Sequence, residues 1–302
     1  MALPRPSADT AVVVTGAASG IGREVARELS LRGYNLVLAD IQDAVGETAD
    51  QLRGHRVEVE VHQLDLTEPE ARGKFIEAVQ SGPRAIVGVA NVAGLISIGR
   101  FDKLALGRER ILVDVSVSAL HHLTGAFLPA MQARGEGAIL NVASPAGVAP
   151  LPYLASYSAA KAFVIYFSTA LHAELKGSGV SCTTFLPGIT KTPLAYGIEE
   201  TKFLPDWAWS LPGFHEPSNT ARRAVRSMLR GKKLGTAGPD AWLVSLAPRY
   251  VPPGLLQPVV RVAGKYAFPG EYETSGQRVR AGLEKALGRI GGAGHADKPK
   301  SW

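Results

Sequence analysis

Three side chains near the middle of the chain have the types and the spacing that proton transfer to a carbonyl requires. Ser144 ends an apolar run, Tyr157 follows 13 residues later, and Lys161 comes four residues after Tyr157. Residues four apart share one face of a helix, and a nearby ammonium lowers the pKa of a phenol. Tyr157 could then exchange a proton with an alcohol or carbonyl oxygen that Ser144 holds in line. The Tyr–Lys spacing alone is weak evidence for a catalytic pair, so the residues around it must show whether the two act together.

A second pattern, TGAASGIG from Thr15 to Gly22, lies between an apolar run and a helical pattern. Its glycines allow a tight turn and a close approach of the backbone to a ligand. The helix start offers free N–H groups and partial positive charge to a pyrophosphate. Asp40 ends the next apolar run, where a carboxylate can accept hydrogen bonds from ribose hydroxyls and would repel a 2′-phosphate. The pattern predicts a dinucleotide cofactor, NAD(H) in preference to NADP(H).

The G-x-x-x-G-x-G spacing and the Ser, Tyr and Lys positions resemble the short-chain dehydrogenase/reductase family over about residues 10–230. The resemblance implies that Asp65 contacts the adenine amino group and that PGITKT (187–192) borders the nicotinamide. NVAG (91–94) matches the family's N-N-A-G except at Val92. The cofactor-binding residues expected on these grounds are Gly16, Ser19, Gly20, Ile21, Gly22, Asp40, Asp65, Leu66, Asn91, Ala93, Gly94, Tyr157, Lys161, Pro187, Gly188, Ile189, Thr190 and Thr192.

The same resemblance gives Ser144, Tyr157 and Lys161 the roles of orienter, general acid/base, and activator that also binds the nicotinamide ribose. It further implies an asparagine in the long helix after the fourth strand, which holds a water of a proton relay. Counting back 13 residues from Pro129 places Ser116 at that position. A serine hydroxyl can still bind a water but lacks the amide carbonyl. We therefore add Ser116 to the catalytic group, with a relay through an extra water and a weakened relay as alternatives.

Apolar runs and helical patterns alternate along the chain. Strands are expected over 11–16, 35–40, 56–65, 85–94, 137–144 and 179–188. Helices are expected from the glycine turn to Gly33 and over 45–54, 68–81, 107–133, 155–176 and 218–231. Such alternation predicts βαβ units, and strands that are apolar on both faces predict helices on both sides. The expected fold is therefore α/β, a Rossmann-like doubly wound parallel sheet.

The predicted dinucleotide-binding and catalytic domain covers 1–234 and includes a substrate lid at about 193–217. Residues 235–302 are expected to form an extension of short helices with a disordered tail. The substrate pocket should lie beyond the carboxyl ends of the strands, with walls from 95–99, 145–154 and the lid. Aromatic side chains in the lid suit a bulky apolar alcohol or ketone; they could equally pack the lid onto the domain or a neighbouring subunit.

The formal charge of +6 over 302 residues is unevenly distributed, because residues 220–302 hold 15 Lys/Arg against 5 Asp/Glu. We favour a solvated surface there, with contact between the C-terminal arm and an anionic membrane as the alternative. No apolar stretch predicts a membrane span, and we expect no nucleic-acid module and no metal site. The single Cys182 fits a buried strand and a cytoplasmic protein. The family resemblance implies a homodimer or homotetramer that pairs through helices 107–133 and 155–176.

The leading hypothesis is an NAD(P)(H)-dependent oxidoreductase that interconverts a secondary alcohol and a ketone, with Tyr157 as general acid/base. One alternative is an epimerase or lyase that uses the same tyrosine without net redox change. Another is a non-catalytic dinucleotide-binding protein, which the serine at position 116 and the basic arm motivate.

Overall fold

The computed structural model describes residues 2–192, 214–239 and 241–243. Within them, parallel strands form one sheet in the order β3-β2-β1-β4-β5-β6-β9. The strands are β1 (Thr10–Thr15), β2 (Asn35–Asp40), β3 (Val59–Gln63), β4 (Ala85–Asn91), β5 (Gly137–Val142), β6 (Val180–Leu186) and β9 (Leu234–Thr236). The predicted Rossmann-like parallel sheet is confirmed.

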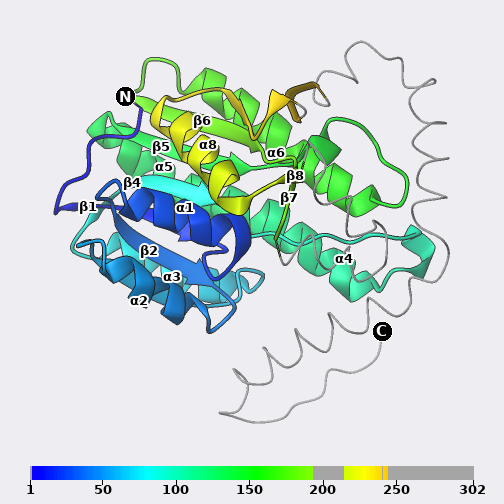
Figure 1. Cartoon of the computed structure of the whole chain (residues 1–302), viewed down its shortest axis with the longest axis horizontal. Coiled ribbons are helices and arrows are strands. Elements are labelled where there is room, and N and C mark those ends of the chain that lie inside the picture. Colours follow the sequence, from blue (N-terminus) through cyan, green and yellow to red (C-terminus); the bar gives the residue numbers. More distant parts are fainter. Residues whose placement is uncertain (1, 193–213, 240, 244–302) are drawn as a thin grey trace, which may run out of the picture.

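Helices cover both faces of the sheet (Figure 1). One face carries α1 (Gly20–Ser30), α2 (Val45–Arg53) and α8 (Pro217–Leu229). The other carries α3 (Pro69–Gln80), α5 (Leu120–Arg134) and α6 (Ala155–Glu174), with α4 (Leu106–Val113) leading into α5. Successive strand side chains point to opposite faces, so Val12 and Val14 join one core and Ala11 and Val13 the other.

The helix expected over 107–133 has a π-helical turn, Asp114–Ala119, between α4 and α5. Such turns are rare and often mark functional sites, and this one contains Ser116. Leu106–Arg134 is also the one helix in the described part of the chain with the length and apolarity of a membrane span. Leu123, Phe127 and Met131 pack it against the sheet, so part of its apolar surface belongs to the core of the domain.

Several short elements had no clear signal in the sequence. They are β9, the parallel pair β7 (Ile189–Thr190) and β8 (Phe214–His215), and the 3-10 turns η1 (Phe101–Lys103) and η3 (Pro145–Gly147). The domain boundary expected after residue 234 falls within β9, directly after the first residue of that strand. Of the expected lid, residues 193–213 lie outside the described residues, and so does the arm from 244 onward.

The expected strand 85–94 ends earlier, at Asn91. Beyond it, the N–H groups of Val92 and Ala93 donate to the side-chain Oγ1 of Thr15 on β1, at 3.0 and 3.1 Å. The glycine turn, Asp40, the NVAG segment, Ser144 and the PGITKT segment each follow the carboxyl end of a strand or occupy it. In a parallel sheet these ends share one edge, so the fold brings the predicted site residues to the same side.

Candidate active site

The glycine turn leaves no room for a side chain at Gly16 or Gly22. Gly16 has φ of +69°, and a Cβ there would lie 2.8 Å from the backbone of Ala93. A Cβ at Gly22 would lie 1.9 Å from the carbonyl oxygen of Gly16. Ser19 at the N-cap of α1 makes no capping hydrogen bond, and the first turn has no acidic residue. The start of α1 thus presents N–H groups and positive dipole to an anion, which fits the pyrophosphate of a dinucleotide.

Asp40 has a structural task that the sequence did not reveal. Its Oδ2 accepts a hydrogen bond from the N–H of Ala18 and its Oδ1 from the N–H of Gln42, both at 2.9 Å. Burial raises the pKa of Asp40, and these backbone hydrogen bonds partly oppose the rise. Each carboxylate oxygen has a second lone pair. Asp40 can therefore hold the glycine turn and still accept a hydrogen bond from a ribose hydroxyl.

Asn91 turns its side chain into the protein interior. Its Nδ2 donates to Asn141 Oδ1 at 2.8 Å and to Thr124 Oγ1 at 3.1 Å. The Nδ2 of Asn141 in turn donates to Ser168 Oγ at 2.9 Å, and all four residues are buried. This network ties the end of β4 to β5, α5 and α6. The Asn91 Oδ1 has no hydrogen-bond partner among the described residues.

The three predicted catalytic side chains come together. Ser144 follows β5, and its Oγ accepts a hydrogen bond from the N–H of Ala146 at 3.1 Å. Tyr157 lies in the first turn of α6, where the side chain of Ser144 is near enough to affect the pKa of its hydroxyl. Lys161 lies one turn further, with Nζ 5.9 Å from the centre of the Tyr157 ring. The arrangement joins a hydroxyl pair to a cation at the carboxyl edge of the sheet.

The expected lowering of the Tyr157 pKa by Lys161 is wrong for this arrangement. Burial raises the pKa of Tyr157, and the nearby Ser144 side chain opposes the rise only in part. Burial also lowers the pKa of Lys161 to about 8. The Lys161 ammonium lies over the ring face and donates to the carbonyl of Val142 at 3.1 Å. Desolvation is thus the largest cause of the pKa shift in both groups.

Ser116 lies close to Lys161, beside Gly94. A Cβ at Gly94 would lie 3.5 Å from Lys161 Nζ and 3.9 Å from Ser116 Oγ. Ser116 is 1% exposed, and its Oγ has no hydrogen-bond partner among the described residues. A buried hydroxyl without a partner costs free energy, so this atom fits contact with a polar ligand or a water. Ser116, at the position predicted from the resemblance, thus lies on the same side of Gly94 as Lys161.

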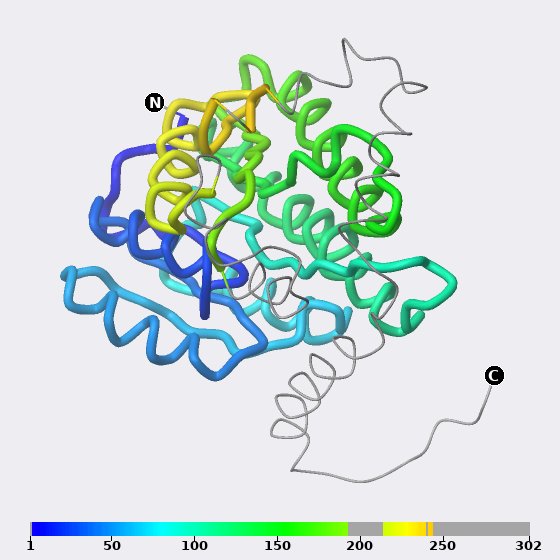
Figure 2. The backbone as a smooth tube through the Cα atoms, turned by 45° about the vertical axis from the view of Figure 1, so that its right-hand side comes forward, coloured from blue at the N-terminus to red at the C-terminus, as the bar shows by residue number. Residues whose placement is uncertain are grey.

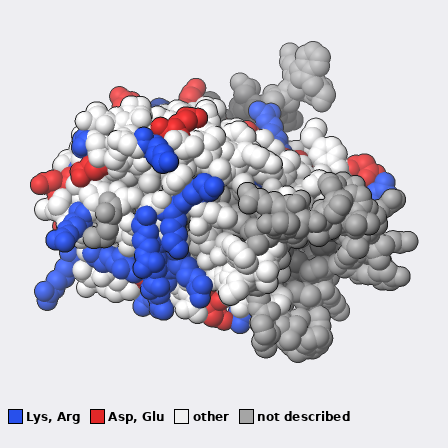
Figure 3. All heavy atoms as spheres, turned by 90° about the horizontal axis from the view of Figure 1, so that it is seen from above, with Lys and Arg blue, Asp and Glu red and all other residues white. Residues whose placement is uncertain are grey.

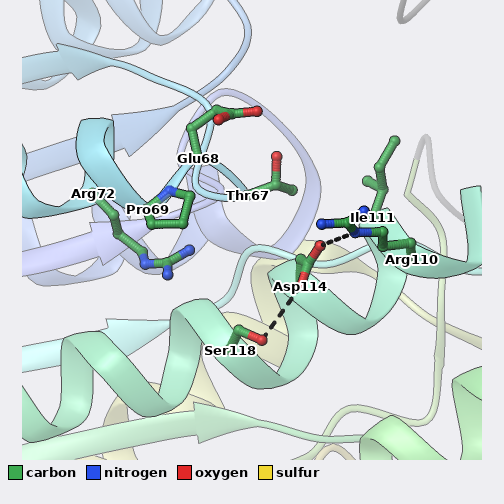
Figure 4. Close-up of a pocket in the computed structure, with 8 residues that line it drawn as sticks. All are labelled: Thr67, Glu68, Pro69, Arg72, Arg110, Ile111, Asp114 and Ser118. Carbon is green, nitrogen blue, oxygen red and sulfur yellow. Dashed lines mark hydrogen bonds and ion pairs between the residues drawn. The ribbon is translucent and has the colours of Figure 1, made fainter. Parts of the chain in front are cut away.

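Asp65 and Leu66 mark the expected adenine end. Asp65 Oδ1 accepts hydrogen bonds from the N–H and Oγ1 of Thr67, both at 2.8 Å, and Arg72 Nη1 donates to the Leu66 carbonyl at 2.6 Å. A cavity of about 440 Å³ adjoins this turn, between the start of α3 and the α4 helix with its π-helical turn (Figure 4). Its lining is Thr67, Glu68, Pro69, Arg72, Arg110, Ile111, Asp114 and Ser118. It contains none of the catalytic side chains, so it does not mark the substrate pocket.

The PGITKT segment folds back on itself after β6. Gly188 has φ of +68°, and a Cβ there would lie 3.1 Å from the His215 ring. Thr190 is buried, and its Oγ1 contacts the Pro187 carbonyl and the Thr220 hydroxyl at 3.3 and 3.2 Å. Ile189 is 51% exposed beside it. Gly188 and Ile189 thus present backbone and an apolar side chain toward the outside, whereas Thr190 holds the segment to α8.

Two of the three expected pocket walls meet around Tyr157. Leu95 and Ile96 from one wall, and Ala146 and Leu154 from the other, pack in one cluster with Tyr157. Of the third wall, 193–217, residues 193–213 lie outside the described part, and the last residues form β8 and the start of α8. In the described ranges no group of three or more His, Cys, Asp or Glu side chains could hold a metal ion, and the expected lack of a metal site stays a prediction.

Comparison with known proteins decides the family. A family model described as short chain dehydrogenase matches residues 10–202. The chain belongs to the short-chain dehydrogenase family. Members of this family are oxidoreductases that bind NAD(P), and the glycine turn and the Ser–Tyr–Lys group of this chain occupy the matched region.

Among curated relatives, the "Probable oxidoreductase EphD" of Mycobacterium tuberculosis is 33% identical over 262 residues, covering 82% of this chain and 44% of the relative. The "Very-long-chain 3-oxoacyl-CoA reductase-A" of Danio rerio is also 33% identical, covering 60% of this chain and 58% of the relative. The chain therefore spans about half the length of the curated relatives it matches.

Solved structures of this family share the fold. A putative NAD(P)-dependent gluconate 5-dehydrogenase from Beutenbergia cavernae, with bound NADP, has a TM-score of 0.71 and 26% identity, covering 80% of this chain and 100% of that one. A short-chain dehydrogenase from Sphingobium yanoikuyae in complex with NADPH has a TM-score of 0.67 and 26% identity, covering 95% and 99%. Both similar proteins carry the phosphorylated cofactor, so they do not favour NAD over NADP for this chain.

Proposed function

We propose that this short-chain dehydrogenase interconverts a secondary alcohol and a ketone, with Tyr157 as the general acid/base. The observation that carries the proposal is the meeting of Ser144, Tyr157 and Lys161 at the carboxyl edge of the sheet, where the glycine turn also lies. The bound nicotinamide would supply or accept the hydride. Side chains of this chain would transfer the proton and position the substrate oxygen.

The Tyr157 hydroxyl gives a proton to the carbonyl oxygen in reduction and takes it back in oxidation. Its raised pKa keeps it protonated at neutral pH, as the reduction of a ketone requires. Ser144 donates a hydrogen bond to the same oxygen and holds it in line. Lys161, with a pKa of about 8, can exchange its proton near neutral pH. The nearby Ser116 hydroxyl supports passage of that proton by way of a water.

The proposed cofactor is NAD(H), with NADP(H) less favoured. Asp40 supports this choice, because its buried carboxylate lies against the glycine turn. A 2′-phosphate near this carboxylate would meet an anion, whereas ribose hydroxyls would meet a hydrogen-bond acceptor. Binding of NADH and NADPH to the full chain, followed by tryptophan fluorescence, tests the choice. NADPH binding tighter than NADH would refute the Asp40 argument.

The proposed substrate is bulky and apolar. Support comes from the apolar cluster of Leu95, Ile96 and Leu154 beside Tyr157, and from the relative named for reduction of very-long-chain 3-oxoacyl groups. We also propose a homodimer or homotetramer in the cytoplasm. Val113 on α4 and Phe163 and Tyr166 on α6 are 40%, 36% and 76% exposed, and such apolar side chains suit a subunit contact.

A series of ketones of increasing size, assayed with NADH at 340 nm, tests the function. The proposal expects NADH oxidation that rises from acetone through cyclohexanone to bicyclic and long-chain ketones. Product formation without a change in NADH would point to an epimerase or lyase and refute the redox proposal. Tight cofactor binding without turnover of any ketone or alcohol would point to a non-catalytic binding protein.

A further inference from the structure

Most of the basic excess of the C-terminal quarter belongs to α8 and the turn after it rather than to the arm. This segment is free of Asp and Glu from residue 217 to residue 239. Its six cations are all exposed: Arg222, Arg223, Arg226, Arg230, Lys232 and Lys233. They supply six of the ten excess positive charges that residues 220–302 carry. The charge is therefore attached to a folded, well-packed element.

The α8 helix holds these cations in a fixed arrangement. Its inner face, with Ala221, Ala224, Val225 and Met228, is buried in the core beside α1. Residues 222, 226 and 230 are four apart and so form one outward stripe, about 6 Å between neighbours from the helix rise. None of the arginines of α8 has an ion-pair partner in the described ranges. Their charge is thus available to an outside anion.

The neighbouring helix extends the same face. α1 lies beside α8 (Figure 1 and Figure 2) and adds Arg23 and Arg27, which are 49% and 55% exposed. Among the described residues, both approach a single carboxylate, that of Glu24, at 3.9 and 3.8 Å. Figure 3 shows Lys and Arg side chains gathered on the side of the molecule that carries these helices, with few acidic side chains among them. We call Arg23, Arg27 and the six cations of α8 and the turn after it the basic face.

Exposed leucines accompany the basic face. Leu31, directly after α1, is 54% exposed, and Leu234, directly after Lys233, is 39% exposed. Cations beside exposed leucines suit a membrane interface, where charge meets anionic headgroups and apolar side chains enter the acyl boundary. Residues 217–239 have no aromatic side chain, whereas single-stranded nucleic acids are bound by stacking on aromatic rings. The chemistry of the face therefore favours a lipid surface.

We propose that the basic face docks on an anionic phospholipid surface. α8 begins at Pro217, directly after β8, which pairs with β7 at the segment expected to border the nicotinamide. Docking through α8 would thus hold that side of the site near the bilayer, where an apolar ketone or alcohol concentrates. This purpose rests on the proposed function, but docking itself does not. Each cation near an anionic surface contributes about fivefold in binding.

Co-sedimentation of the full chain with lipid vesicles tests the docking. The chain should bind vesicles with about 30% phosphatidylserine at low salt, and weakly bind vesicles of phosphatidylcholine alone. The triple variant Arg222→Gln, Arg226→Gln, Arg230→Gln should bind the anionic vesicles about 100-fold less tightly. Raising the salt from about 50 to 500 mM should weaken the binding of the wild type to anionic vesicles, because a shorter screening length reduces the attraction between exposed cations and the headgroups.

The matched control removes three exposed cations from other elements, with Lys74→Gln, Lys103→Gln and Lys176→Gln. It should keep most of the wild-type binding. An equal loss of vesicle binding in the control would mean that net charge alone drives binding, which would refute docking through the basic face. Unchanged vesicle binding in the α8 variant would refute it as well. Tighter binding to a DNA duplex than to anionic vesicles would refute the lipid surface. Turnover of a water-soluble ketone should be the same in the α8 variant and the wild type, which separates this test from that of the proposed function.

Discussion

Replacing Lys161 by methionine should make the protein more stable while it abolishes turnover. Lys161 is 6% exposed, and burial lowers its pKa from 10.5 to about 8. Desolvation is the only cause of this shift, so the charged lysine is a cost to the folded state. A methionine side chain of similar length removes the charge and keeps an apolar chain in the same space. The account thus expects stability and activity to change in opposite directions at this position.

The size and the pH dependence of the effect follow from the two pKa values. A folded-state pKa lowered from 10.5 to about 8 corresponds to about 3 kcal/mol. The folded pKa is below the unfolded one, so this cost is complete below pH 8 and disappears as pH rises toward 10.5. It is about 3 kcal/mol at pH 7 and about 2 kcal/mol at pH 9. Loss of the hydrogen bond to Val142 offsets about 1 kcal/mol.

The Lys161→Met protein should therefore unfold in urea with a free energy about 2 kcal/mol above wild type at pH 7, and about 1 kcal/mol above it at pH 9. Both proteins are compared at one concentration, so that subunit association does not enter. Lys176→Met is the matched control, because Lys176 is exposed; it should change the free energy by less than about 0.5 kcal/mol. A Lys161→Met protein that is less stable than wild type at pH 7, or a difference that is the same at both pH values, would refute the reasoning.

Two further substitutions test the cofactor turn. Gly22→Ala should abolish NADH binding and lower the free energy of unfolding by more than 2 kcal/mol, because its Cβ would lie 1.9 Å from the Gly16 oxygen. Gly125→Ala in α5 is the control, because a Cβ there would have nothing within 4 Å. In the same denaturation assay it should raise the free energy of unfolding by about 0.5–1 kcal/mol. Asp40→Ala should shift the ratio of NADH to NADPH affinity toward NADPH in a fluorescence titration, and should cost about 1–3 kcal/mol because the N–H groups of Ala18 and Gln42 lose their acceptor; an unchanged ratio would contradict the role of Asp40.

The order of strands and helices could be predicted because local patterns carry it. Apolar runs ended by glycine, Asp40 or Ser144 alternate with helical patterns, and the structure has a strand and a helix at each expected place. The short elements could not be predicted in this way. β9 has three residues, Leu234–Thr236, and is fixed by pairing with β6. The π-helical turn around Ser116 likewise leaves no local pattern in the sequence.

The candidate site could be predicted as residue types at strand ends, but its electrostatics could not. Opposite charges at helical spacing suggest a lowered pKa for Tyr157, whereas burial, which no spacing reveals, raises it. The hydrogen bonds of Thr15 to the NVAG segment were missed because they join residues far apart in the chain. Asn141 gave a signal that was not used. An asparagine in the middle of an apolar strand must find partners, and here they are Asn91 and Ser168.

The Tyr157→Phe substitution tests the central claim most directly. It removes one hydroxyl and keeps the ring, so the apolar cluster with Leu112 and Ala160 remains. NADH affinity should stay within about twofold of wild type, while the rate of NADH oxidation with a bulky ketone should fall about 100-fold or more, the size of a lost general acid. A Tyr157→Phe protein that turns over the ketone at the wild-type rate would contradict the assignment of Tyr157 as the proton donor.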